Sequence, residues 1–238
     1  APYGGANTAT LSITSAPASF ALNTYRCVVT GSCAPAAISN AAELTIQRKP
    51  VITTNPSDFT TCNTSIQASY SVTATGTGLA YQWQTSSTGV AGTYTNLSNN
   101  ANFSGVTTST LSIINGSLAL NNNFFRCVVS GTCAPATISN AAQLFINMQA
   151  AITTQPANAT VCETANTSFT TSATGTGLTY QWQVNTGAGF ANVTNTGVYS
   201  GATAATLNIT GATNSMNGYT YRCYVAGVCG PIAVTNVV

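Results

Sequence analysis

Apolar and polar side chains alternate along several short stretches of the chain. The alternation is most regular at residues 69–74, 110–113 and 125–129, where every second side chain is apolar. A period of two predicts short β-strands with one buried face. Turns rich in glycine or asparagine, such as 76–78 and 98–100, separate these stretches at the spacing expected of a β-sandwich. Helix signals are weak throughout, so we predict an all-β fold.

The sequence also repeats itself along its length. The stretch 26–35 recurs at 126–135 and, more loosely, at 222–231. The offsets are 100 residues (127 − 27) and 96 residues (223 − 127), measured on the first cysteine of each copy. A second marker, Tyr-Gln-Trp-Gln, occurs at 81–84 and again at 180–183. A repeat of this length has the size of one sandwich domain of about seven strands, so we predict tandem β-sandwich domains placed end to end.

Aligning the copies divides the chain into three parts. Residues 1–49 match only the second half of the repeat, residues 50–149 form one complete unit, and residues 150–238 lack the end of their last strand. The expected interpretation is that the sequence is one segment of a longer series of repeats. The alternative is that each open end is completed by a strand from another molecule. The connections between units, at 47–50 and 147–150, are very short, which predicts a stiff rod.

Several motifs carry a resemblance to a known family. A tryptophan (Trp83, Trp182) is combined with Tyr-x-Cys or Phe-x-Cys at 25–27, 125–127 and 221–223, followed by Ser-Asn-Ala-Ala-x-Leu-x-Ile. This order resembles an immunoglobulin-like domain of the intermediate type. The repeat Ala-Thr-Gly-Thr-Gly-Leu-x-Tyr-Gln-Trp-Gln is similar to the tandem immunoglobulin-like repeats of very large secreted surface proteins in Bacteroidetes. The resemblance covers essentially the whole chain, and such domains serve as spacers, adhesins and binding modules.

Composition narrows the functions that this fold can carry. Only 3% of the residues are charged and there is no histidine, so the usual general acids, general bases and metal ligands are nearly missing. The carboxylates of Glu43, Asp58 and Glu163 stand alone, which excludes a calcium cage or a glycosidase pair. We therefore expect no enzyme activity, no metal site and no cofactor. The scattered basic residues argue against a nucleic-acid partner, and no apolar run is long enough to span a membrane as a helix.

The eight cysteines include no Cys-x-x-Cys pair, so they predict disulfide bonds and an oxidising, extracellular setting. An antibody-type bridge is not expected, because Cys62 lies 21 positions before Trp83 (83 − 62). Along an extended strand this cysteine is roughly 25 to 30 Å from the place that such a bridge requires, at about 3.3 Å per residue. A disulfide bond needs Cα atoms within about 7 Å of each other. We predict instead one hairpin bridge in each unit: Cys27 to Cys33, Cys127 to Cys133, and Cys223 to Cys229.

Cys62 and Cys162 have no partner in this scheme. In an immunoglobulin-like sandwich, as the resemblance implies, they would fall at the turn into the second strand, at the end of the unit that faces the next domain. Two interpretations stay open for each of them. One is a buried thiol. The other is a covalent staple to the adjacent domain or to a neighbouring molecule.

The remaining candidate side chains also have two interpretations. Trp83 and Trp182 are expected in the core rather than on a sugar-stacking platform. Arg26, Arg126 and Arg222 lie on the outward face of the same strand in each unit. They are either solvated or in contact with the next domain or an acidic glycan.

These patterns favour a structural and adhesive extracellular protein that forms an elongated surface stalk, fibre or filament. Its expected partners are neighbouring copies of the same repeat or protein, because a net charge of only +2 does little to keep molecules apart. Glycans or cell surfaces are further candidate partners. The alternative function is a carbohydrate-binding module of a secreted multidomain protein.

Overall fold

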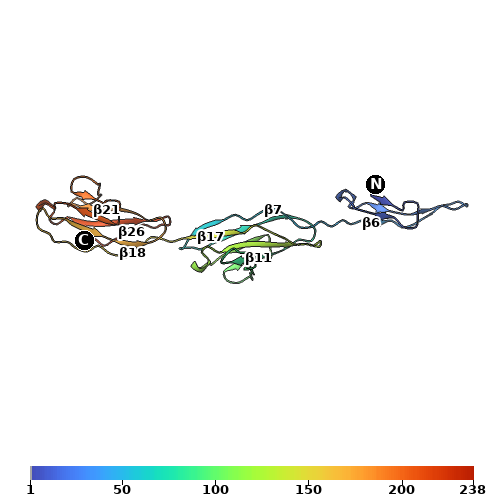
Figure 1. The fold of residues 1–238 in the computed structure, drawn as a ribbon, viewed down its shortest axis with the longest axis horizontal. Coiled ribbons are helices and arrows are strands. Elements are labelled where there is room, and N and C mark those ends of the chain that lie inside the picture. The colour runs from blue at the N-terminus through green and yellow to red at the C-terminus, as the bar shows by residue number, and fades with distance from the viewer. Residues whose placement is uncertain (1) are drawn as a thin grey trace.

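The computed structural model describes residues 2–238 and consists of three bodies of short β-strands placed end to end (Figure 1). We call them the N-terminal unit (β1–β6), the central unit (β7–β17) and the C-terminal unit (β18–β26). The helical segments of the described chain are single turns of 3-10 helix, one in each unit: η1 (Ala18–Phe20), η2 (Leu118–Leu120) and η3 (Asn214–Met216). The predicted all-β class is confirmed.

The central unit is a sandwich of two layers. Its strands are β7 (Val51–Thr54), β8 (Phe59–Cys62), β9 (Ala68–Ser71), β10 (Thr73–Thr75), β11 (Ala80–Ser86), β12 (Thr95–Asn96), β13 (Phe103–Ser104), β14 (Thr110–Ile113), β15 (Phe124–Ser130), β16 (Thr137–Ile138) and β17 (Ala142–Asn147). One layer has the order β12–β11–β15–β17–β8, with β16 also paired to β15. The other layer contains β13–β14–β9 and the pair β10–β7. The last strand, β17, runs parallel to β8.

Aromatic side chains close the core of the central unit. Trp83 is fully buried, and its indole N–H donates to the carbonyl of Thr108 at 2.9 Å, which satisfies the polar end of the ring. Tyr70 and Phe125 stack with ring centroids 5.1 Å apart. Cys127 lies opposite Trp83 in the pairing of β15 with β11 and is also fully buried. The two layers are therefore held by packing, without a disulfide bond between them.

The C-terminal unit repeats this arrangement up to its last strand. Its strands are β18 (Ala151–Thr154), β19 (Thr167–Thr170), β20 (Ser172–Thr174), β21 (Thr179–Asn185), β22 (Phe190–Asn192), β23 (Tyr199–Ser200), β24 (Thr206–Ile209), β25 (Thr220–Ala226) and β26 (Ala233–Val234). Trp182 is fully buried, and its indole N–H donates to the carbonyl of Ala204 at 2.9 Å. Val238 pairs with Tyr221 through two backbone hydrogen bonds of 2.8 and 3.0 Å. Residues 155–166, which include the counterpart of β8, form no strand here.

The N-terminal unit contains only one part of such a sandwich. Its strands are β1 (Tyr3–Gly4), β2 (Ser12–Ile13), β3 (Thr24–Tyr25), β4 (Val28–Val29), β5 (Ala37–Ile38) and β6 (Ala42–Glu43). Leu11 is 43% exposed and Val29 is 62% exposed, whereas their counterparts Leu111 and Val129 are fully buried. The apolar face of this unit is therefore open to solvent.

Candidate functional site

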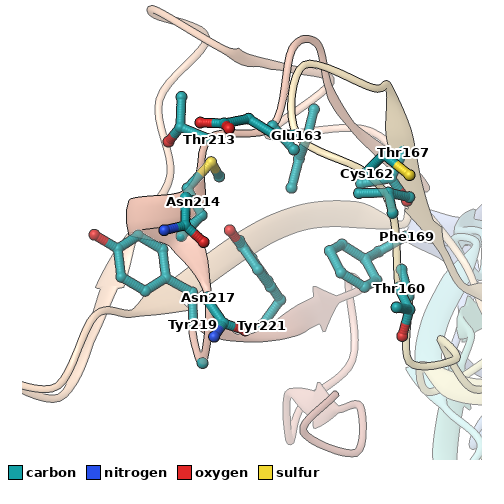
Figure 2. A pocket seen from close by; sticks show the side chains of 16 residues that line it. Thr160, Cys162, Glu163, Thr167, Phe169, Thr213, Asn214, Asn217, Tyr219 and Tyr221 are labelled. Atoms are coloured by element: carbon teal, nitrogen blue, oxygen red, sulfur yellow. The ribbon is translucent and has the colours of Figure 1, made fainter.

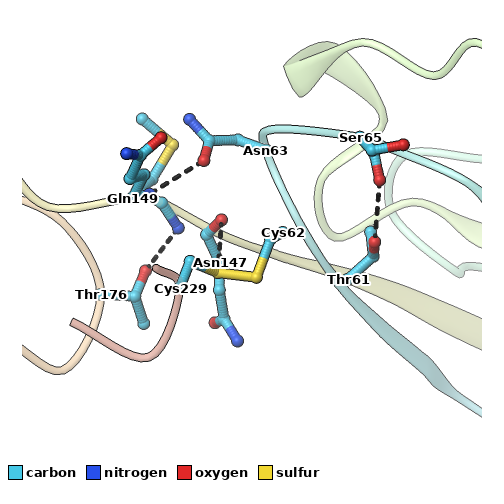
Figure 3. The surroundings of a disulfide bond; sticks show 9 residues. Thr61, Cys62, Asn63, Ser65, Asn147, Gln149, Thr176 and Cys229 are labelled. Atoms are coloured by element: carbon cyan, nitrogen blue, oxygen red, sulfur yellow. Dashed lines mark hydrogen bonds between the residues drawn. A yellow bond between two sulfur atoms is a disulfide. The ribbon is translucent and has the colours of Figure 1, made fainter. Parts of the chain in front are cut away.

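A disulfide bond between Cys62 and Cys229 joins the central unit to the C-terminal unit (Figure 3). The two residues are 167 positions apart in the sequence, and their Cα atoms are 5.9 Å apart. Cys62 ends β8 and lies in register beside Asn147 of β17. Cys229 belongs to the loop between β25 and β26 and is buried. The bond therefore fastens the end of one sandwich to a loop of the next.

Both units also hold the linker between them, residues 148–150. The N–H of Met148 donates to the Thr176 hydroxyl at 2.8 Å, and the N–H of Thr176 donates to the Met148 carbonyl at 2.9 Å. From the other side, the N–H of Gln149 donates to the side-chain oxygen of Asn63 at 2.9 Å (Figure 3). The polar backbone groups of the linker are thus paired with both neighbours, which leaves the joint little freedom.

The joint between the N-terminal and central units has the same backbone contacts. The N–H of Arg48 donates to the Thr77 hydroxyl at 3.0 Å, and the N–H of Thr77 donates to the Arg48 carbonyl at 3.1 Å. The carbonyl of Thr77 accepts from the N–H of Thr132 at 3.0 Å, as that of Thr176 accepts from Val228 at 2.9 Å. We call Thr77 and Thr176 the joint threonines. Each links the preceding linker to the β15–β16 or β25–β26 loop of its own unit.

The glycine before each joint threonine permits the close approach of the linker. Gly175 has φ +149°, and a Cβ atom there would lie 3.0 Å from the Cα of Ala150. Gly76 has φ +150°, and its Cβ would lie 3.1 Å from the Cα of Pro50. A larger residue would be strained and would push the linker away. The sequence periodicity did not predict this role, although the recurrence of Gly-Thr-Gly beside each linker is a signal that points to it.

The predicted hairpin bridges do not form in this structure. Cys229 is bonded to Cys62, so its predicted partner Cys223 remains a buried thiol. The pairing fails because Cys223 lies opposite Thr235, whose hydroxyl accepts its N–H at 2.8 Å, while Cys229 lies farther along in the loop.

The same reason applies to the other two pairs. Cys127 points into the core and its N–H donates to the hydroxyl of Ser139, whereas Cys133 lies in the loop beyond β15. Cys127 lies three residues before the end of β15 at Ser130, which is about 10 Å of extended strand at about 3.3 Å per residue. Cys27 and Cys33 are likewise separate thiols, both exposed. Short separation along the chain favoured the hairpin pairs, but the backbone of each strand cysteine is paired with the neighbouring strand and its loop partner lies beyond the strand end.

Cys62 and Cys162 have different states. Of the two interpretations given for Cys62, the structure has the staple to the adjacent domain. Cys162, its counterpart in the C-terminal unit, is an exposed thiol. It lies at the edge of a groove beside Glu163 and Thr167 (Figure 2).

The buried thiols are poor nucleophiles. Burial raises the pKa of Cys127 to about 11 from the usual 9.0, although a backbone hydrogen bond with Gln82 lowers it in part. Burial raises the pKa of Cys223 to about 11 in the same way. Since the thiolate is the reactive form, these two cysteines act as small core residues.

Two of the three repeated arginines are bound within their own unit. The guanidinium of Arg126 lies 3.8 Å from the centre of the Tyr94 ring, and its Nε donates to the side-chain oxygen of Gln84 at 2.8 Å. Arg222 lies 4.0 Å from the centre of the Phe190 ring and donates to Gln183 at 2.9 Å. The outward position predicted from the sequence did not reveal these contacts within the unit, and both arginines remain half-buried.

The acidic side chains of the described chain do not gather into a cluster. Across residues 2–238, no three histidine, cysteine or acidic side chains gather to hold a metal ion. The carboxylate of Asp58 accepts the N–H of Gln143 at 2.7 Å and serves to fix β17. None of the helical turns in the described part of the chain has the length and hydropathy to cross a membrane.

No protein-family model and no curated protein matches the sequence, but many solved structures share its fold. The chain is similar to the I-band fragment from titin, with TM-score 0.62 and 14% identity over 95% of this chain and 76% of that chain. It is also similar to extracellular domains 3–5 of Drosophila OTK, with TM-score 0.52 and 16% identity over 94% and 73%. Immunoglobulin domains 1–4 of Sidekick-1 give TM-score 0.57 and 15% identity over 98% and 62%. At these identities the likeness shows the fold, which is a tandem array of immunoglobulin-like β-sandwiches, as predicted.

Proposed function

We propose that this chain belongs to a structural and adhesive extracellular protein, in which immunoglobulin-like units form a stiff stalk, fibre or filament. The observation that carries the proposal is the joint between the central and C-terminal units. There a disulfide bond joins the two units, and three hydrogen bonds, two of them to side-chain acceptors, hold the backbone of the linker 148–150 from both sides. A joint of this kind fixes the orientation of one unit relative to the next. A spacer or stalk needs a fixed orientation, whereas a freely hinged binding module does not.

The disulfide bond also supports the extracellular part of the proposal. Such bonds persist in oxidising compartments and are rare where glutathione keeps thiols reduced. We place the repeats among large secreted surface proteins of the Bacteroidetes type, with the unit boundaries after residues 49 and 149. The role is that of a spacer or adhesin without catalysis.

The alternative, a carbohydrate-binding module, receives less support from the exposed sheet face. Sugar platforms use free aromatic ring faces. On this face the rings of Tyr94 and Phe190 are each covered by an arginine of the same unit. One face of each of these rings is therefore already occupied.

Small-angle X-ray scattering on the monomeric chain tests the proposal. A compact protein of 238 residues has a radius of gyration of about 18 Å. We expect a much larger value and a long tail in the distance distribution, both unchanged between low and high salt because both joints are hydrogen-bonded and one of them is also covalent. A compact particle, or a distribution that requires freely hinged units, would overturn the rod.

A further inference from the structure

Tyr199 and Tyr221 are in contact through their hydroxyl groups in the C-terminal unit. The two phenol oxygens are 3.0 Å apart, so one hydroxyl donates a hydrogen bond to the other. The ring centroids are 6.3 Å apart and the ring planes are inclined by 62°. Tyr199 lies on β23 and Tyr221 lies on β25. Two phenols therefore meet at their hydroxyl ends inside one unit.

This contact joins the two layers of the unit. β23 belongs to the sheet β19–β24–β23, and β25 belongs to the sheet β22–β21–β25–β26. Antibody domains have a disulfide bond between their two sheets. Within the described chain these two sheets have no such bond, and Cys223 of β25 is a buried thiol. The tyrosine pair thus lies between two layers that are held by packing alone.

The same pair occurs in the N-terminal unit. Tyr3 and Tyr25 occupy the aligned positions, on β1 and β3. Their hydroxyl oxygens are 3.2 Å apart. Their ring centroids are 6.1 Å apart and the ring planes are inclined by 59°. The contact between two phenols is therefore a recurring feature of the repeat.

The central unit has two phenylalanines at these positions. The rings of Phe103 and Phe125 have centroids 6.5 Å apart and planes inclined by 51°, close to the geometry of the tyrosine pairs. The core therefore closes without hydroxyl groups. A buried hydroxyl without a partner is destabilising, which explains why each unit has two tyrosines or none. It does not explain why two units have the hydroxyls, so the pair adds a chemical property that packing does not need.

Solvent reaches the two tyrosines of the C-terminal pair unequally. Tyr199 is partly exposed, whereas Tyr221 is only 4% exposed. Burial and the hydrogen bond with Tyr199 raise the pKa of Tyr221, so its hydroxyl keeps its proton at neutral pH. A reagent from solvent therefore meets Tyr199 first, and it reaches Tyr221 only through the hydrogen bond between them.

We infer that Tyr199 and Tyr221 are a site of oxidative cross-linking, at which the two rings couple to dityrosine and tie the layers of the unit together. Tyr3 and Tyr25 form the same site in the N-terminal unit. The oxidant is hydrogen peroxide acting through a haem peroxidase. The inference goes beyond the proposed rod, which needs no covalent bond within a unit.

The first steps produce two radicals. Tyr199 loses an electron to the peroxidase and its hydroxyl proton to water. Tyr221 then transfers the hydrogen atom of its hydroxyl across the 3.0 Å contact to the Tyr199 radical. This transfer moves the radical to the buried ring and restores the outer phenol. A second one-electron oxidation of Tyr199 leaves two phenoxyl radicals side by side.

The two radicals combine at carbon. The unpaired electron of a phenoxyl radical is shared between the oxygen and the ortho and para carbons, and the ortho carbons flank the carbon that bears the oxygen. Because the oxygens touch, an ortho carbon of each ring lies near the other ring. One C–C bond forms, and the hydrogen on each coupled carbon moves to the oxygen of its ring. In total the two tyrosines lose two hydrogen atoms, and one molecule of hydrogen peroxide becomes two molecules of water.

The product is a staple within the unit. It closes the chain between two positions that are 22 residues apart and joins one sheet to the other. The bond between Cys62 and Cys229 fixes one unit to the next, whereas this bond fixes the layers inside one unit. Thiols open a disulfide bond by exchange but do not cleave a C–C bond. The staple is therefore permanent.

The test uses the full chain after its exposed thiols have been alkylated, at a dilution at which collisions between molecules are rare. Treatment with hydrogen peroxide and a haem peroxidase should produce the blue fluorescence of dityrosine. After proteolysis, mass spectrometry should find the Tyr199 peptide joined to the Tyr221 peptide, with the loss of two hydrogen atoms. Absence of this product would overturn the inference. Absence of a joined Tyr3 and Tyr25 peptide would overturn its extension to the N-terminal unit.

Conservative variants test whether the hydroxyl contact directs the coupling. In Tyr199→Phe the buried Tyr221 should remain unmodified, because its path to the oxidant is lost. The variant should fold, since the central unit has Phe103 in this position. Tyr219→Phe is the matched control, because Tyr219 lies just before β25 and outside the pair, and it should leave the yield unchanged. Full modification of Tyr221 in Tyr199→Phe, or loss of the product in Tyr219→Phe, would overturn the inference.

Hydrogen exchange tests whether the bond holds the layers together. In the cross-linked protein we expect the amides of β23 and β25 to exchange about a hundredfold more slowly, the factor expected for closing a loop of this length. The amides of β13 and β15 should be unchanged, since Phe103 and Phe125 cannot couple in this way. Equal exchange in β23 and β25 before and after oxidation would overturn the role of a staple.

Discussion

Met148 and Thr176 exchange two hydrogen bonds across the joint, of 2.8 Å to the threonine hydroxyl and 2.9 Å to the methionine carbonyl. Arg48 and Thr77 make the same exchange at the preceding joint, at 3.0 and 3.1 Å. The bonds use only the backbone of the linker residue, so methionine and arginine serve equally well in that position. The two joints therefore have the same pair of hydrogen bonds although their linker sequences differ.

Replacing the joint threonines should loosen the linkers. In a variant with Thr77→Val and Thr176→Val, the N–H groups of Arg48 and Met148 lose their acceptors, at a cost of about 1 kcal/mol each. We expect their amide hydrogens to exchange about fivefold faster, as measured by NMR. Thr107→Val is the matched control, because Thr107 is exposed and its hydroxyl makes no hydrogen bond within the described chain. Equal protection of both amides in the variant and the parent would refute the role of the hydroxyls.

Removing the disulfide bond should affect the joint and spare the cores. The central and C-terminal units each have their own cluster of buried side chains, so Cys229→Ser is expected to leave the far-UV circular dichroism unchanged. Proteolysis within linker 148–150 should become faster, and the scattering profile should show a wider range of shapes. Cys133→Ser changes the same loop position in the central unit, where no bond is made in this structure, and should leave a monomer unaffected. Identical cleavage rates in all three proteins would mean that the bond does not stiffen the joint.

The fold could be predicted because its signals are local. Alternation at 110–113 and 125–129 became β14 and β15, and the period placed Trp83 and Trp182 in equivalent buried positions. Both depend on side chains a few residues apart or on simple recurrence. Such signals can be interpreted without knowing which distant segments of the chain are in contact.

The joint could not be predicted in the same way. The Cys62–Cys229 bond joins residues of different units, and its distance depends on the orientation of two sandwiches. Sequence spacing correctly excluded an antibody-type bridge from Cys62 but assigned Cys229 to the nearest cysteine in the chain. The role of the joint threonines in holding the linkers could not be predicted either, because Gly-Thr-Gly is also an ordinary turn sequence.

Thiol labelling should separate the cysteines into two groups. With a pKa of about 11, Cys127 and Cys223 are deprotonated in only about one molecule in a thousand at pH 8. Both are also fully buried. Iodoacetamide should therefore modify Cys27, Cys33 and Cys162 in the native protein and reach Cys127 and Cys223 only after unfolding. Rapid modification of either buried thiol under native conditions would contradict the burial described here.

Stability should fall as the pH rises above 9. The pKa of Cys127 and Cys223 is about 11 in the folded chain against an ordinary value of 9.0, so the folded state keeps protons that the unfolded state releases. Their contribution is complete below pH 9 and is lost as the pH approaches 11. Burial also raises the pKa of Tyr70 and Tyr221, which acts in the same direction at still higher pH. Urea midpoints at pH 8 and pH 10.5 measure the loss, which should be smaller in a variant with Cys127→Ala and Cys223→Ala.

The repeated arginines allow a comparison within one protein. Arg126 stacks on Tyr94 and donates to Gln84, whose own amide donates to Asn96 at 2.9 Å, so it links neighbouring strands β15, β11 and β12. Arg126→Met should lower the free energy of unfolding of the central unit by about 1 to 2 kcal/mol, from the lost cation–π contact and the unpaired Gln84 oxygen. Arg26 holds the same place in the repeat but is exposed and has no such ring or glutamine beside it, so Arg26→Met should change stability by less than about 0.5 kcal/mol. Equal urea midpoints for the two variants would show that the repeated arginine is a solvated cation after all, and that the ring contact contributes nothing to the sheet.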